Sequence, residues 1–281
     1  MYKLFELSPG ARLDIARSGI KTCPGPTNHL HPSGSIRKLS LFVLCSTFAL
    51  CTAIAGPPPP PASTVMPLNL VNLGSAAPFA VFGASGVTNT GKTVITGNLG
   101  VYPIAGTAVT GFKGENAGGP GVVIGTIDDN DTGPETTAAQ HAAASLGIAI
   151  NDAKGRPCTP CTLLAGDLSG MTLTPGLYKS TSTLALTGNL TLSGKGVYIF
   201  QIASGLTINV SSQVHLTNGA QAQCVFWQVG SAATLSGNVI FEGTIMAGSG
   251  VTFGSGTTLT GRALSQTNVT FIADTVTLPS K

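Results

Sequence analysis

The apolar residues of this chain come in short runs that glycine, asparagine and serine interrupt. After residue 163, the runs LALTG (184–188), LTLSG (190–194) and VYIFQIA (197–203) are rich in residues that favour extended backbone. Each run ends at turn-forming residues. The pattern predicts many short strands joined by tight corners.

A fixed period of 18 residues organises the C-terminal part of the chain. Thr234, Thr252 and Thr270 are separated by this step each time. A constant period with a strand-like pattern is typical of stacked coils, in which each repeat buries its apolar side chains against its neighbours. Because two or three short strands fit into 18 residues, we predict a mostly β fold, a β-helix. A second set keeps the same step: Val239, Thr257 and Thr275, with Ile240, Thr258 and Val276 beside them.

Alternation within the repeat predicts which side chains face solvent. Ala233, Val251 and Val269 each precede one of the three threonines, and neighbouring side chains on a strand point to opposite sides. The apolar set is expected inside, so the threonines are expected outside. Successive coils lie about 4.8 Å apart, the spacing of paired strands. The sequence therefore predicts a ladder of outward threonines.

One segment breaks the strand pattern and predicts a single amphipathic helix over about 134–154. The segment 132–155 has a capping threonine and a proline at its start, a glycine at its end and apolar residues at helical spacing. Its apolar residues are mostly alanines, so the helix is expected to lie close to a flat surface. The buried face is expected at Ala142, Leu146, Ala149 and Ala153.

The N-terminal residues have the features of an export signal. Arg37 and Lys38 precede an apolar run that ends near Ala55 in residues suited to cleavage. The alternative, a membrane anchor, is disfavoured because a run of about 17 residues is at the bottom of the spanning range. We expect residues 1–55 to be an extended leader that is removed, leaving no stable membrane span and a secreted protein, extracellular or held in the periplasm or at the cell surface. The proline-rich stretch 56–67 is then a stiff spacer before one domain, 68–281.

Charge is scarce, and its balance changes when the leader is removed. Residues 1–55 hold six of the 14 basic residues and two of the 11 acidic ones, so the rest of the chain has a net charge near −1. Nucleic-acid binding needs clustered lysine and arginine, and no such cluster remains. Nucleic acid is therefore not an expected partner.

The stretch GVTNTGKT (86–93) matches the phosphate-binding loop G-x-x-x-x-G-K-[ST]. That loop works when a helix begins at its lysine and directs backbone N–H groups at the phosphates. Here the following residues, VITGNLG (94–100), alternate like a strand and contain glycine, so no helix is expected. We interpret the match as an accident of a Thr- and Gly-rich strand and expect no nucleotide.

Three cysteines follow the leader. Cys158 and Cys161 form C-T-P-C, and Cys224 stands alone. No second C-x-x-C and no histidine pair completes a zinc site. In an exported chain a small disulfide between Cys158 and Cys161 is the favoured interpretation, and Cys224 is interpreted as a buried apolar residue.

The sequence offers no catalytic set, so we expect no enzyme activity, no metal and no cofactor. The charged residues after Met171 fall singly, without a pair at the spacing of a general acid and base. The aspartates of IDDNDTG (127–133) lack the calcium-loop pattern, and His141 and His215 have no partner near in sequence.

Regular outward threonines on a nearly uncharged face are typical of a surface that could order water. Threonine carries a methyl and a hydroxyl on one stiff side chain. A grid with steps of about 6.6–7 Å along a strand and about 4.8 Å between coils resembles the repeat distances on ice crystal planes. The alternative is that threonine is simply a favourable outward residue on strands. The pattern alone leaves both interpretations open.

Several longer stretches follow one another in a characteristic order: LGSAAPFAVFGASGVTNTG, ITGNLGVYPIAGTAVTGF, INDAKGR, LLAGDLSGMTLTPGLYKS, GVYIFQI, VFWQVGSAATLSG, FEGTIMA and GRALSQTNVT. On these stretches, from about Asn69 to Pro279, the chain resembles the ice-binding proteins of the DUF3494 family. The resemblance implies a discontinuous right-handed parallel β-helix of triangular section with one long helix packed alongside. It also implies a secreted antifreeze protein that adsorbs to ice, limits crystal growth and inhibits recrystallisation.

Some members of that family carry T-[AG]-x-[TN] on a flat ice-binding face, which selects candidate residues here. The segments 231–234 and 249–252 fit with serine in the first place, and 267–270 fits except for Asn268. Strict matches occur at 107–110 and 90–93, where Lys92 would be a poor ice contact. The implied candidates are Ser231, Thr234, Ser249, Thr252, Thr267 and Thr270, with weaker candidates Thr90, Thr93, Thr107 and Thr110.

The favoured function is therefore a monomeric ice-binding protein whose partner is the ice surface and whose flat Thr/Ser-rich face gives thermal hysteresis and recrystallisation inhibition. The alternative is a cell-surface adhesin or a structural β-solenoid without ice activity, which the proline spacer permits. An enzyme acting on polysaccharides would need a groove with paired acids, and the sequence lacks them.

Overall fold

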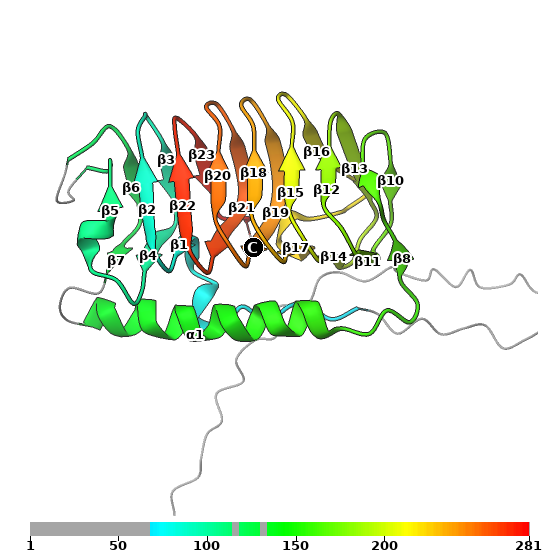
Figure 1. Cartoon of the computed structure of the whole chain (residues 1–281), viewed down its shortest axis with the longest axis horizontal. Helices are drawn as coiled ribbons and strands as arrows, with labels where there is room; N and C mark the ends of the chain where they lie inside the picture. Colours follow the sequence, from blue (N-terminus) through cyan, green and yellow to red (C-terminus); the bar gives the residue numbers. More distant parts are fainter. Residues whose placement is uncertain (1–67, 114–117, 130–133, 281) are drawn as a thin grey trace, which may run out of the picture.

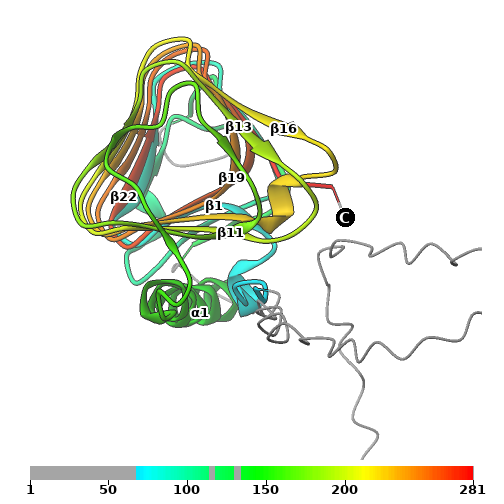
Figure 2. The ribbon, with the colours of Figure 1, turned by 90° about the vertical axis from the view of Figure 1, so that its right-hand side faces the viewer.

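The structure is a computed structural model that describes residues 68–113, 118–129 and 134–280. The expected leader (1–55) and spacer (56–67) lie outside the described residues. Short strands stack into a solenoid of triangular cross-section, and one long helix runs along one side of it (Figures 1 and 2). The predicted mostly β, parallel β-helix with one accompanying helix is confirmed.

The coils contribute strands to three faces, which parallel pairing joins from coil to coil. The helix face contains β8 (Thr162–Leu163), β11 (Gly176–Ser180), β14 (Tyr198–Ile202), β17 (Val225–Val229), the second halves of β19 (Ile240–Ala247) and β21 (Thr258–Ser265), β1 (Phe79–Gly83), β4 (Asn98–Val101) and β7 (Ile127–Asp128). The threonine face contains β9 (Gly166–Asp167), β12 (Leu184–Leu186), β15 (Leu206–Ile208), β18 (Ala233–Leu235), β20 (Val251–Phe253), β22 (Asn268–Phe271), β2 (Gly86–Asn89) and β5 (Val109–Thr110). The back face contains β10 (Thr172–Leu173), β13 (Asn189–Ser193), β16 (Gln213–Thr217), the first halves of β19 and β21, β23 (Thr275–Thr277), β3 (Val94–Thr96) and β6 (Val122–Ile124). The described residues also form three short 3-10 helices: η1 (Gly74–Ala76), which lies beside α1, η2 (Gly106–Ala108) and η3 (Ala222–Cys224).

The coils follow a different order in space than in sequence, so the solenoid is discontinuous, as predicted. Strand β22, near the C-terminus, pairs on one side with β20 and on the other with β2, near the N-terminus. The coils of residues 79–128 therefore extend the stack beyond the C-terminal coil. Helix α1 (Pro134–Gly155) then runs back along the stack to its opposite end, where β8 begins (Figure 1).

The interior is filled by ladders of apolar side chains, one rung from each coil. Ala233, Val251 and Val269 have no exposed surface, as the alternation predicts. Aromatic rings also stack from coil to coil: the ring centroids of Phe200 and Trp227 lie 3.8 Å apart. Burial of this continuous core, at about 25 cal/mol per Å² of apolar surface, is the main term that holds the coils together.

Two glycines allow the corner between the back face and the helix face to be tight. Strands β19 and β21 both pass through this corner, at Gly243 and Gly261, which pair with each other. Gly243 has a φ of 109°, a conformation that favours glycine. A Cβ on Gly261 would lie 1.8 Å from the backbone oxygen of Gly243. Only a residue without a side chain lets the two coils approach this closely.

The 18-residue period holds on the threonine face but fails at one corner of the back face. Ile240 pairs with Thr258 as predicted. The predicted alignments of Thr257 with Thr275 and of Thr258 with Val276 are wrong, because Thr258 pairs with Thr275. The last coil is therefore one residue shorter at this corner.

Asp274 explains how the shorter corner is closed. Its carboxylate accepts hydrogen bonds from backbone N–H groups of its own corner and of the coil before it. The donors are Ile272 (2.8 Å), Ala273 (3.2 Å) and Thr257 (3.0 Å). A buried carboxylate that satisfies three backbone donors replaces the contacts that an additional residue would make.

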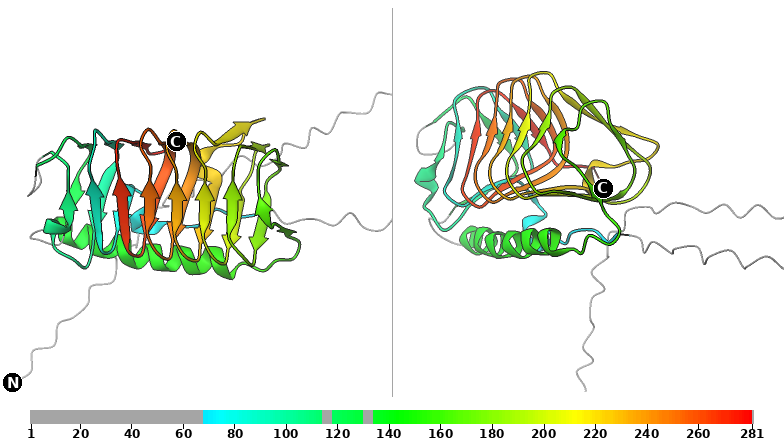
Figure 3. Two further views of the ribbon diagram at one scale, coloured as in Figure 1. Left: turned by 45° about the horizontal axis from the view of Figure 1, so that its top comes forward. Right: turned by 45° about the vertical axis from the view of Figure 1, so that its right-hand side comes forward.

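Helix α1 packs against the helix face and follows the stack (Figure 3). Its predicted buried face is confirmed: Ala142, Leu146, Ala149 and Ala153 are at most 2% exposed. The opposing side chains form one apolar cluster with them: Phe82, Ile199, Phe226, Met246 and Leu264. Because alanine side chains are small, the helix axis comes close to this surface. The apolar side of the helix and the apolar side chains of the helix face are both buried as a result.

The C-terminal end of helix α1 is held by polar contacts. The amide of Gln201, on β14, donates to the backbone oxygens of Ala153 (2.8 Å) and Arg156 (2.9 Å). The Arg156 guanidinium forms an ion pair with Asp152 at 2.7 Å and donates to the backbone oxygen of Leu70. These bonds satisfy carbonyl groups that a helix end leaves without partners and join the helix to segment 68–73.

Other features of the described chain complete the fold. Cys158 and Cys161, just after α1, are joined by a disulfide, the pairing favoured from the sequence. Cys224 is buried. Among the described residues, no helix combines the length and the apolar character needed to cross a membrane.

Candidate functional site

A straight ladder of six threonines runs along the threonine face, which is turned toward the viewer in Figure 1. Parallel pairing places the six at equivalent positions of adjacent strands, with Asp167 and Ala185 continuing the row at one end. At about 4.8 Å per strand, the row of threonines is about 24 Å long. In spatial order the ladder is Thr207, Thr234, Thr252, Thr270, Thr88 and Thr110.

The ladder threonines face solvent because their chain neighbours fill the core. Thr88, Thr234 and Thr252 are exposed, and the other three are half-buried. The residues immediately before them are buried apolar side chains, such as Val251 and Val269. The alternation predicted for the C-terminal coils is confirmed, and it continues into the N-terminal coils.

A second rank of hydroxyl groups lies three residues before the ladder, where each coil enters the threonine face. Serine or threonine occupies this position in all six coils. Backbone hydrogen bonds fix the rank across the coils: the Ser249 N–H donates to the Ser231 oxygen (3.0 Å), and the Ser85 N–H to the Thr267 oxygen (2.7 Å). The rank consists of Ser204, Ser231, Ser249, Thr267, Ser85 and Thr107.

Small residues separate the two ranks of hydroxyl groups. Glycine or alanine lies two residues before the ladder threonine in five of the six coils, and Asn268 is the exception. The Thr267 hydroxyl donates to Asn268 Oδ1, and Asn268 Nδ2 donates to the Thr270 hydroxyl, both at 3.3 Å. One coil thus has its two hydroxyl groups engaged by a side chain where the other coils have only a methyl group or a hydrogen.

Charge is confined to the end of the threonine face. Asp167 is the one charged residue among the eight paired positions of the row. The hydroxyl of Thr187 donates to its carboxylate, and so does that of Ser169 at 2.7 Å. Chiefly the bond from Thr187 lowers the pKa of Asp167 to about 2. The six threonines themselves form an uncharged strip.

A sequence profile of the family described as Ice-binding-like matches residues 81–277, which include every coil of the threonine face. The chain belongs to the Ice-binding-like family. An ice-binding protein of Flavobacterium frigoris is 39% identical over 219 residues, which cover 75% of this chain and 78% of that protein. An ice-binding protein of a Nostoc species is 42% identical over 200 residues, covering 69% and 68%.

Solved structures in this family share the fold. An ice-binding protein from an Arctic yeast superimposes with a TM-score of 0.71 at 34% identity, covering 75% of this chain and 95% of that one. One from an Antarctic biological consortium superimposes with a TM-score of 0.67 at 39% identity, covering 75% and 92%. These relatives are named as ice-binding proteins and not as enzymes.

The structure places the candidate residues of this family member in four different settings. Thr234, Thr252, Thr270 and Thr110 lie in the ladder. Ser231, Ser249, Thr267 and Thr107 lie in the second rank. Thr90 is exposed at the apex where the threonine face meets the back face. Thr93 has no exposed surface: its hydroxyl donates to Asn89 Oδ1 (2.7 Å) and accepts from the Asp274 N–H (3.1 Å), so it is removed from the candidate surface.

Two ladder residues, Thr88 and Thr207, were missing from the candidates chosen by sequence. Each ends a serine-first form of the same motif: Ser85-Gly86-Val87-Thr88 and Ser204-Gly205-Leu206-Thr207. Applying the serine-first form to the whole chain would have found both.

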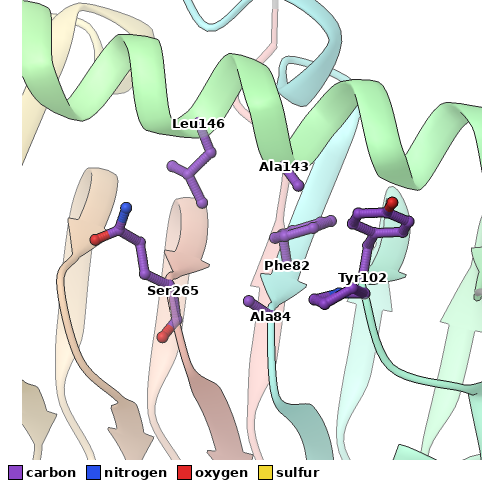
Figure 4. Close-up of a pocket in the computed structure, with 8 residues that line it drawn as sticks. Phe82, Ala84, Tyr102, Ala143, Leu146 and Ser265 are labelled. Carbon is purple, nitrogen blue, oxygen red and sulfur yellow. The ribbon is translucent and has the colours of Figure 1, made fainter.

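Other parts of the molecule offer less to a ligand. No helix follows Lys92, because β2 ends at Asn89 and β3 begins at Val94. Within the described ranges, no group of three or more His, Cys, Asp or Glu residues is placed to hold a metal ion. A hollow of about 260 Å³ between α1 and the helix face is lined mainly by Phe82, Tyr102, Leu146 and other apolar groups (Figure 4).

Proposed function

We propose that this protein binds ice through its threonine face and so slows crystal growth. The observation that carries the proposal is the uninterrupted, in-register ladder of six threonines in a chain of the Ice-binding-like family. A second rank of serine and threonine runs parallel to it. The absence of charged residues among the six ladder threonines adds support, because charged groups would orient nearby water toward themselves.

The chemistry of threonine suits a surface that must order water without holding it irregularly. Its β-branched side chain has few accessible rotamers, so the methyl and hydroxyl groups keep fixed positions. The parallel pairing repeats these positions at about 4.8 Å. Waters held between hydroxyl groups and methyl groups at this regular spacing can join an ice lattice without rearrangement. The ordering is supplied by the folded protein and costs little at the moment of adsorption.

Adsorption of this kind limits growth through the shape of the ice front. Ice must bulge between bound protein molecules, and a curved surface melts at a lower temperature than a flat one. The expected results are a gap between melting and freezing temperatures, faceted crystals and inhibition of recrystallisation. We also propose that the protein is secreted, because ice forms outside cells first and residues 37–55 have the features of an export signal.

Replacing one central ladder residue tests the proposal. Thr252→Tyr places an aromatic ring on the strip and holds the neighbouring side chains away from the ice. Because a gap of about 1 Å already forfeits up to about half of the van der Waals attraction, and the ring holds the face further away than that, hysteresis is expected to fall below about half of the wild-type value at equal concentration. The measurement is thermal hysteresis with observation of crystal shape in dilute buffer.

A matched variant controls for the added ring. Ile148 is 69% exposed on the outer side of α1, away from the threonine face, so Ile148→Tyr is expected to retain full hysteresis. Circular dichroism establishes that both variants are folded. A wild-type protein that is folded but gives no gap and unshaped crystals would overturn the proposed function. A folded Thr252→Tyr protein with full activity would overturn the choice of face.

A further inference from the structure

The back face carries a second regular array of side chains. Strands β6, β3, β23, β21 and the first half of β19 pair in register and present two parallel outward rows. Neighbours within a row are one coil apart, and the two rows are two residues apart along each strand. The first row is Val122, Val94, Thr275, Thr258 and Ile240, and the second is Ile124, Thr96, Thr277, Thr260 and Glu242.

The array is made almost wholly of β-branched residues. Threonine, valine and isoleucine fill every position of the two rows except that of Glu242. Such side chains are restricted at χ1, so each row presents methyl groups at well-defined positions, with hydroxyl groups at five of them. Ile124 is 59% exposed and Ile240 is 44% exposed, although large aliphatic side chains are usually buried.

Glu242 marks the boundary of the flat array. It is half-buried at the end of the second row. Beyond it the pairing of the back face is interrupted, because β16 pairs with β19 only at Gln213 and Ile240. Strand β16 then projects away from the stack, as the end-on view shows (Figure 2). Glu242 is the one charged residue in the two rows, and it lies at the end of the second row.

We propose that this part of the back face is a second ice-adsorbing surface. The inference rests on the proposed function and extends it to a second face. The occupant is identified by the two-dimensional repeat: about 4.8 Å between coils and about 6.6–7 Å between rows. A crystal lattice can match such a repeat over its whole area, whereas a protein partner other than a second solenoid presents no matching period.

The two faces are adjacent but inclined to each other. They meet along the apex opposite the helix face in the triangular section (Figure 2). Exposed Thr90 and Ile272 lie on this apex, between the ladder and the back face. One molecule with two inclined adsorbing surfaces would attach to more than one set of ice planes. That consequence separates this proposal from adsorption through the threonine face alone.

Adsorption of fluorescently labelled protein to a single-crystal ice hemisphere tests the proposal, because the labelled zones show which planes are occupied. The variants are Thr252→Tyr on the threonine face, Thr258→Tyr on the back face and the double variant. Thr258 is exposed, so the fold is expected to tolerate the ring. Thr275→Tyr, one coil along in the same row, repeats the test independently, and Ile148→Tyr is the matched control.

The expected result is that wild-type protein occupies two sets of planes. Thr252→Tyr loses one set, Thr258→Tyr loses the other, and the double variant loses both. The proposal is overturned if both back-face variants occupy the same planes as wild-type protein while Thr252→Tyr occupies none, a result that leaves the proposed function standing. No adsorption by wild-type protein would instead remove the proposed function itself.

The competing occupant of the back face is a second copy of the chain. Analytical ultracentrifugation of the same samples tests this by measuring their oligomeric state. A single monomeric species in wild-type protein and in Thr258→Tyr is expected. A wild-type dimer that Thr258→Tyr converts to a monomer, with unchanged ice planes, would make the back face a contact between copies and would overturn the proposal.

Discussion

At the residue scale, the threonine face depends on what lies between its two ranks of hydroxyl groups. Five coils have glycine or alanine there, and Asn268 occupies the sixth. Its amide group is hydrogen-bonded to both Thr267 and Thr270, so these hydroxyl groups are partly withdrawn from water. The same side chain also stands higher than its neighbours on an otherwise level strip.

Asn268→Ala is therefore expected to raise thermal hysteresis at equal concentration. The substitution gives residues 267–270 the sequence Thr-Ala-Val-Thr, which also occurs at 107–110, and frees two hydroxyl groups at the centre of the face. Because the site is on the surface, its unfolding free energy is expected to change by less than about 0.5 kcal/mol. Asn189→Ala, exposed on β13 outside both regular arrays, is the control. Lower hysteresis in a folded Asn268→Ala protein would show that the asparagine itself contributes to binding.

At the element scale, helix α1 and the strands of the helix face stabilise one another without touching the threonine face. Alanines of the helix pack on Phe82, Met246 and Leu264. Gln201 is the polar member of this interface and binds the C-terminal carbonyls of the helix. The helix covers what would otherwise be an exposed apolar side of the solenoid.

Gln201→Leu is expected to lower the unfolding free energy by about 1–3 kcal/mol, because it leaves buried carbonyl groups without a donor. The measurement is the urea midpoint at constant slope. Lys179→Leu, the exposed neighbour of Gln201 in the same row, is the control and should change stability by less than about 0.5 kcal/mol. Hysteresis of folded Gln201→Leu should equal that of wild-type protein. An unchanged midpoint would contradict the role assigned to this amide.

At the scale of the whole molecule, much of the architecture could be predicted from the sequence because apolar and polar residues repeat at short, constant spacings along the chain. The 18-residue step of Thr234, Thr252 and Thr270, the inward partners of these threonines and the buried face of α1 all follow from spacing. A period of two residues on a strand, or of 3.6 residues on a helix, shows which side of that element is buried.

What the period could not show is where separate parts of the chain meet. Thr88 lies beside Thr270 because the N-terminal coils stack on the C-terminal coil, a contact between residues far apart in sequence. Thr93 matched the motif but is buried, because its hydroxyl closes a corner with Asn89 and Asp274. Corner lengths depend on such individual hydrogen bonds, and a strict repeat cannot anticipate them.

The central claim is that the six-threonine ladder acts as one continuous adsorbing surface. A tyrosine scan measures this most directly: Thr207, Thr234, Thr252, Thr270, Thr88 and Thr110 are each replaced, and thermal hysteresis is recorded for every folded variant. The greatest loss is expected at Thr252 and Thr270, in the centre of the ladder, and the smallest at Thr207 and Thr110, where a ring obstructs only one end. Losses of hysteresis that did not depend on position along the ladder, or full activity in every variant, would contradict the account.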